Sequence, residues 1–161
     1  MRRGSPPNYV SLANNRSHAV RYGYLGGTTI EDIPNIRAAF DWILGNVYNP
    51  TDLNAYHSDA DPLPDVIVHD FNYPLFPSLA GWVNCPPDNT GTGGTDPNRW
   101  CRGQTLVLNS YLYWFDNSVF DTDAQRRNIA CHEMGHTVGL RHRAELTSCM
   151  YTYAGAGAAA V

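Results

Sequence analysis

Residues 130–142 read ACHEMGHTVGLRH, and this stretch constrains the protein more than any other. It holds three of the six histidines and one of the three glutamates in a chain of 161 residues. A buried helix face normally carries leucine or isoleucine, because an imidazole in a core needs a hydrogen-bond partner and costs free energy without one. Such a density of histidine therefore indicates a functional cluster.

The spacing within this stretch is typical of a metal site. His132 and His136 are four residues apart, so on a helix they project from the same face and can bind one metal ion. Glu133 points beside that pair and can approach a water molecule without being a ligand. Gly139 can adopt a left-handed backbone conformation that ends the helix, which leaves His142 on the returning chain. Three neutral nitrogens leave zinc one open position, as in catalytic sites.

The predicted chemistry is amide hydrolysis. Zinc lowers the pKa of a water molecule from about 15.7 towards 7, and a nearby carboxylate can take the proton and deliver it to a leaving amine. Glu133 is the candidate for that general base. The alternative is a coincidental histidine cluster, which background residue usage makes rare, on the order of one chain in 10⁵ for the full pattern.

The same residues carry a resemblance to a known family. The signature H-E-x-x-H-x-x-G-x-x-H is matched by His132, Glu133, His136, Gly139 and His142. With Met150 eight residues later in SCMY, the chain resembles the metzincin zinc peptidases, most closely matrixins and a group of small actinobacterial matrixin-like proteins. The likeness runs from Ala38 to Met150 and is specific from Ala130 onward. It implies an α+β, zincin-type fold with a twisted, mostly parallel sheet, an antiparallel edge strand, two main helices and a short C-terminal part.

The resemblance also implies a role for individual residues. One catalytic zinc would be held by His132, His136 and His142, with Glu133 as general base and with Gly139 and Met150 as structural support. Met150 would form a hydrophobic floor. Family members align peptide along an antiparallel edge strand, which by order in the chain would be LAGWVNC, residues 79–85. The expected substrate-binding residues are Gly81, Trp82, Val83 and Tyr151.

Four cysteines favour two disulfides in a secreted domain, because none lies in a C-x-x-C zinc or redox motif. Sequence alone allows three pairings. A bridge between Cys85 and Cys101 would close the base of a loop rich in Gly and Pro. If Met150 lies under the metal, as the resemblance implies, Cys131 and Cys149 are close enough to join. A thiolate ligand is the weaker alternative, because three histidines already supply the protein's ligands.

Three other histidines have structural interpretations. His57, Asp59 and Asp61 resemble part of a matrixin calcium or structural-zinc loop but lack the full ligand set, so we expect a solvated turn there and calcium is unsupported. His18 and His69 lie on predicted strands and are expected to be packed or hydrogen-bonded.

Periodicity predicts the remaining elements. Strands are expected at 18–25, 65–70, 78–85 and 103–114, with one helix inside 26–50 that ends at Pro50. A second helix begins at an Asp121 or Thr122 cap and continues to Gly135. The expected organisation is a loose lead over 1–17, one catalytic domain over 18–153 and a low-complexity tail over 154–161.

Composition excludes several classes of partner. The net charge is −4, every one of the 11 basic residues is arginine and no basic run is present, so nucleic acid is not expected. No apolar run is long enough for a membrane span. No signal peptide is visible, although the expected disulfides indicate a secreted protein. We therefore expect a secreted protein whose signal segment is not part of this chain.

The favoured function is a monomeric, extracellular zinc endopeptidase acting on a protein or peptide. Two alternatives remain open. One is a zinc-binding module without turnover, against which Glu133 argues because a ligand-only site needs no such carboxylate. The other is an exopeptidase or an amidase of restricted substrate range.

Overall fold

A five-stranded sheet and two α-helices form the part of the chain that the computed structural model describes, residues 17–22, 33–60, 64–71, 73–75, 79–84, 103–109 and 122–151. The elements follow in the order β1 (Ser17–Tyr22), α1 (Ile33–Ile43), the π-helical turn η1 (Leu44–Tyr48), β2 (Asn54–His57), β3 (Val66–Phe71), β4 (Gly81–Asn84), β5 (Gln104–Asn109) and α3 (Asp123–Thr137).

The sheet is parallel except at one edge. Its strand order is β2-β1-β3-β5-β4, and every neighbouring pair is parallel apart from β4 and β5. β3 and β5 pair over six residues, from Val66 opposite Gln104 to Phe71 opposite Asn109. The predicted α+β class, with a mostly parallel sheet, an antiparallel edge strand and two helices, is confirmed.

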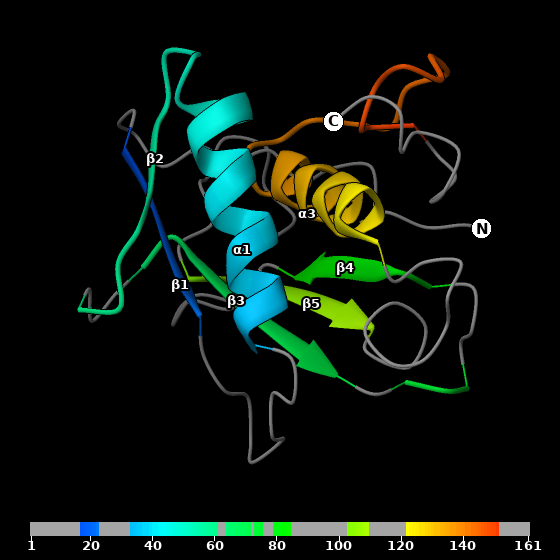
Figure 1. Ribbon diagram of the computed structural model, residues 1–161, viewed down its shortest axis with the longest axis horizontal. Helices are drawn as coiled ribbons and strands as arrows, with labels where there is room; N and C mark the ends of the chain where they lie inside the picture. The colour runs from blue at the N-terminus through cyan, green and yellow to red at the C-terminus, as the bar shows by residue number, and fades with distance from the viewer. Residues whose placement is uncertain are drawn as a thin grey trace, which may run out of the picture.

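Both helices lie against one face of the sheet (Figure 1), where a single core forms. The side chains that α1 buries, Ile36, Phe40 and Ile43, recur at three- and four-residue intervals, as an amphipathic helix requires. They meet the alternate residues of the parallel strands and the inner face of α3. The core comprises Val20, Ile36, Phe40, Ile43, Leu44, Tyr48, Val66, Val68, Val83, Leu106, Leu108, Ile129 and Met134, among others.

Local chemistry sets both ends of α3. The hydroxyl oxygen of Thr122 accepts a hydrogen bond from the Gln125 backbone N–H at 3.2 Å, and Asp123 places a negative charge in the first turn. The predicted Thr122 cap is confirmed, whereas Asp121 lies outside the described residues. The helix continues past Gly135 to Thr137 and stops before Gly139, whose φ is +85°.

The predicted strands and the first helix are confirmed within the described ranges, but β2 was missed. β2 has four residues, of which only Ala55 is buried, and turn-forming residues flank it on both sides, so neither length nor alternation marks it. The remainder of the predicted strands, Cys85, Cys101 and the tail from residue 152 lie outside the described residues. No helix in the described ranges combines the length and the apolar character needed to cross a bilayer.

Candidate metal centre

Three histidine rings converge at the C-terminal end of α3. The Nε2 atoms of His132, His136 and His142 form a triangle in which each pair is 3.2 Å apart. Within the ranges described above, these three side chains are the only group of three or more His, Cys, Asp or Glu placed to hold one metal ion. The predicted ligand set is therefore brought together in space.

In two of the three rings, the other nitrogen lies within hydrogen-bond distance of a backbone carbonyl. Nδ1 of His132 lies 2.7 Å from the carbonyl oxygen of Cys149, and Nδ1 of His136 lies 2.8 Å from that of Leu140. A carbonyl oxygen only accepts, so each Nδ1 carries the proton and donates it. The Nε2 atoms of these two neutral rings consequently present lone pairs towards the shared centre, as ligands must.

The triangle fits a tetrahedral metal ion. Zinc–nitrogen bonds of about 2.0–2.1 Å at tetrahedral angles place the ligand nitrogens about 3.3 Å apart. One proton can bridge a single pair of nitrogens, whereas a divalent cation satisfies all three lone pairs at once. His132, His136 and His142 therefore have the donor set and spacing that zinc requires, and two of them, His132 and His136, are held in the tautomer that binds it.

A glycine-based turn brings the third ring to the first two. The Leu140 N–H donates to the Gly135 carbonyl at 2.9 Å, and the Gly139 N–H donates to the His136 carbonyl at 3.1 Å. This pair of bonds is a Schellman motif, which needs a left-handed residue, and Gly139 supplies it at φ +85°. The turn satisfies the last helix carbonyls and reverses the chain towards His142.

Glu133 is fully enclosed beside the histidines. Its side chain is buried between α3 and β4, and its Oε2 atom has no hydrogen-bond partner in the part of the chain that the structure describes. Burial raises the pKa of Glu133 to about 8. A buried carboxyl oxygen without a hydrogen-bond partner costs free energy unless a cation, a water molecule or a substrate interacts with it. Glu133 is therefore placed to interact with such a group.

Burial also lowers the pKa values of the three histidines. It lowers the pKa of His132 to about 4, with a further lowering from the charge of neighbouring His136. It lowers the pKa of His136 and of His142 as well. These rings therefore remain neutral, which is the form that binds a metal ion, at pH values below the ordinary pKa of histidine.

A disulfide joins the two segments on either side of the site. Cys131, which precedes the first histidine, is bonded to Cys149, which precedes Met150. Met150 is buried against the helix, and a Cβ built at Gly135 would overlap its Sδ atom. The Cys131–Cys149 bridge that the resemblance implies is therefore present, and Met150 packs on the turn of helix that carries the ligands.

Polar side chains from distant strands hold the end of α3. The hydroxyl of Thr137 donates to the Met134 carbonyl at 2.7 Å and accepts from Nε2 of His18 at 3.0 Å. The Thr137 carbonyl accepts from Nε2 of Gln104 at 2.8 Å. His18 on β1 and Gln104 on β5 thus fix the residue that follows His136, and no short-range sequence signal could have indicated these contacts.

A second anchor lies nearer the first ligand. The Tyr48 hydroxyl donates to the Cys131 carbonyl at 2.9 Å, and both residues are buried. The remaining buried histidine, His69, has its Nδ1 3.3 Å from the Asp70 carbonyl. The prediction that His18 and His69 are packed or hydrogen-bonded is confirmed.

The expected substrate strand lies at the sheet edge, as predicted, but its side chains point in different directions. Gly81 is buried against Glu133, and Val83 packs into the core. Trp82 points to the opposite face, where its ring centroid is 5.9 Å from that of Tyr73. Tyr151 is half-buried and its backbone forms an isolated bridge with Arg143.

The region that resembles part of a matrixin calcium loop is an exposed ion-pair cluster. Nε2 of His57 lies 3.0 Å from Asp59 Oδ1, and Arg37 Nη2 lies 3.5 Å from Asp59 Oδ2. These contacts favour the solvated turn that we expected, and Asp61 lies outside the described residues.

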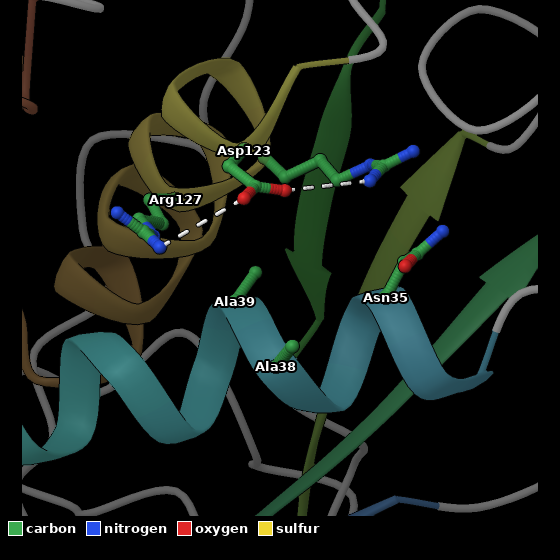
Figure 2. Close-up of a pocket in the computed structure, with 6 residues that line it drawn as sticks. Asn35, Ala38, Ala39, Asp123 and Arg127 are labelled. Carbon is green, nitrogen blue, oxygen red and sulfur yellow. Dashed lines mark ion pairs between the residues drawn. The ribbon is translucent and has the colours of Figure 1, made fainter.

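A hollow of about 40 Å³ lies elsewhere, between α1 and the start of α3 (Figure 2). Asp123 pairs there with two arginines, at 3.7 Å to Arg126 and 4.0 Å to Arg127. The hollow contains none of the three histidines, and its charges already pair with one another. The hollow is therefore separate from the histidine cluster.

The sequence matches no protein-family model and no curated protein. Among solved structures, the chain is similar to one of myroilysin with a TM-score of 0.49 at 17% sequence identity, covering 87% of this chain and 50% of that chain. A second myroilysin structure gives a TM-score of 0.46 at 18% identity, covering 81% and 44%. The chain thus spans about half the length of the myroilysin chains that it matches. A likeness this weak says nothing of function, which must be judged from the site.

Proposed function

We propose that this protein is a zinc-dependent endopeptidase of the metzincin type. The observation that carries the proposal is the convergence of three Nε2 atoms, 3.2 Å apart, beside a buried glutamate. His132, His136 and His142 would hold the ion, which supplies Lewis acidity and lowers the pKa of water. An ion held for structure alone would not need Glu133.

The chain's own residues would carry the proton. Glu133 takes a proton from the attacking water at its carboxylate and returns it to the nitrogen of the leaving amine, so the carboxylate is regenerated at the end of the cycle. Burial keeps bulk water away from this transfer. β4 would bind an extended peptide by strand addition through its backbone, since it is the edge strand of the described sheet that lies against Glu133.

The Cys131–Cys149 disulfide supports a location outside the cytosol, where disulfides persist. A protein or peptide substrate in that compartment fits an extended strand-addition site. We propose a secreted enzyme on this basis.

The test compares the wild type with Glu133→Gln, which keeps the size of the side chain and removes the base. We expect one zinc per chain in both proteins by elemental analysis. We also expect peptide-bond cleavage in a peptide-library digest to fall by about 10²–10⁴-fold in the variant, the usual contribution of a general base. Zinc binding without cleavage by the wild type would instead identify a non-catalytic binding module. Equal cleavage by the two proteins would refute the role of Glu133.

A further inference from the structure

β4 lies in close contact with α3 at Gly81. Alternate residues of β4 face the helices, and at Val83 the space is filled by a side chain that packs in the core. At Gly81 it is not: a Cβ built there would lie 2.9 Å from Cγ and 3.1 Å from Cδ of Glu133. It would also lie 2.9 Å from the carbonyl oxygen of Val107 on β5.

Residue 81 must be glycine because neighbouring atoms leave no room for a side chain, and not because of its backbone conformation. Among the described glycines only Gly103 and Gly139 have positive φ, so the backbone of Gly81 does not itself require glycine. Distances below 3.0 Å are closer than non-bonded carbon atoms pack, which is normally about 3.5–4.0 Å. The stem of Glu133 therefore occupies the volume that a side chain at residue 81 would fill.

We propose that Gly81 is a positioning residue that seats Glu133 on the edge strand and so fixes its carboxylate relative to the substrate. This inference rests on the proposed function, in which Glu133 is the base and β4 binds the peptide. It differs from the role implied by the family resemblance, because Gly81 acts through packing on Glu133 and not only as a backbone contact for substrate.

Packing is the constraint available to this carboxylate. Its Oε2 atom has no hydrogen-bond partner in the described residues, so no bond at that oxygen fixes its direction. If β4 both aligns the peptide and packs against Glu133, a movement of β4 also moves the Glu133 carboxylate. A misplacement of about 1 Å in such an arrangement costs about 10²-fold in rate.

The first experiment compares Gly81→Ala with a matched control, Gly45→Ala. A Cβ at Gly45, an exposed residue of η1, would meet nothing within 4 Å. We expect Gly81→Ala to retain one zinc and to lose about 10²-fold in kcat with a smaller change in KM. Gly45→Ala should match the wild type in zinc content, kcat and KM. An unchanged kcat in Gly81→Ala would overturn the proposal.

The second experiment uses the metal-free protein and needs no activity. Glu133→Ala removes Cγ and Cδ, two of the three atoms nearest to a Cβ at residue 81, and leaves the third, the carbonyl oxygen of Val107. The Gly81→Ala change should therefore reduce the folding equilibrium constant more in the wild-type background than in the Glu133→Ala background, by a factor of about five or more, as expected for residues in contact. Equal reductions would show that the contact between residue 81 and Glu133 carries none of the cost, and would overturn the proposal.

These outcomes separate this inference from the proposed function. If the wild type cleaves no peptide, the proposed function fails, while the folding measurement still reports the contact between Gly81 and Glu133. If Gly81→Ala folds only in the Glu133→Ala background, the contact is supported. If it folds in neither background, Val107 dominates and the proposal is overturned.

Discussion

Nδ1 of His132 donates to the carbonyl oxygen of Cys149 at 2.7 Å, and the neighbouring Cys131 is joined to that same Cys149 by a disulfide. One covalent bond and one hydrogen bond therefore connect the same two segments. The hydrogen bond sets the tautomer and direction of the ring, and the disulfide holds the carbonyl that makes it. We infer that the bridge stabilises the ligand geometry as well as the fold.

Serine replacement of both Cys131 and Cys149 should weaken zinc binding. Each residue keeps its backbone carbonyl, so the variant removes the tether without removing the acceptor. We expect zinc affinity to fall by about 10–100-fold, the usual effect of losing an outer-shell constraint. The free energy of unfolding should fall by about 3 kcal/mol from chain entropy alone, a model-dependent value for a loop of this size. Chelator competition and denaturant unfolding of the metal-free protein measure the two effects.

Serine variants are preferable to a reductant, because they remove this bridge and leave every other cysteine of the chain untouched. Unchanged zinc affinity in the double variant would show that the Cys149 carbonyl stays in place without the disulfide.

Replacement of His142 by alanine should cost more zinc affinity than loss of the disulfide, because it removes one of three ligands and not a support. We expect zinc affinity to fall by more than the roughly 10–100-fold that changes to outer-shell residues produce. His57→Ala is the matched control, since His57 lies in an ion-pair cluster with Asp59 and outside the three-histidine group. Direct zinc titration of both variants makes the comparison, and equal affinities would place the third ligand elsewhere.

The sequence could predict the local part of the site. The spacing of His132 and His136, the Thr122 cap and the left-handed Gly139 are all short-range features, and each depends on geometry that a helix or a turn imposes on nearby residues. The structure confirms the cap and the turn, and it brings His142 to the other two rings. The edge position of β4 came from the family resemblance and not from its own weak alternation.

The supports of the site could not be predicted, because they are long-range contacts. His18 and Thr137 are 119 residues apart in sequence, and Tyr48 and Cys131 are 83 apart. No periodicity or motif around a single buried histidine or tyrosine indicates which residue it bonds to. Gly81 is similar, since a glycine within a strand indicates a close approach but not to which group.

Gln104→Leu should weaken the end of α3. It removes the donor to the Thr137 carbonyl and leaves that buried acceptor unsatisfied, which costs about 1–3 kcal/mol in the free energy of unfolding. Because Thr137 follows His136, zinc affinity should also fall, by about tenfold or more. Asn46→Leu is a matched control: Asn46 donates to the Trp42 carbonyl, but from an exposed position where water can replace it. Equal unfolding free energies for the two variants would contradict the anchoring role of Gln104.

The stability of the metal-free protein should decrease as the pH falls below about 6.5, the ordinary pKa of histidine. Burial lowers the pKa of His18, with the Asp65 charge opposing part of that shift. Between its folded pKa and the unfolded value the unfolded chain binds the extra proton, so acid favours unfolding there, and the contribution of His18 is complete above the unfolded value. One such group contributes a slope of up to about 1.4 kcal/mol per pH unit. His18→Gln removes this titration, so its unfolding free energy, measured by denaturant titration across this range, should depend less steeply on pH than that of the wild type. An identical slope would show that His18 is protonated equally in the folded and unfolded chains.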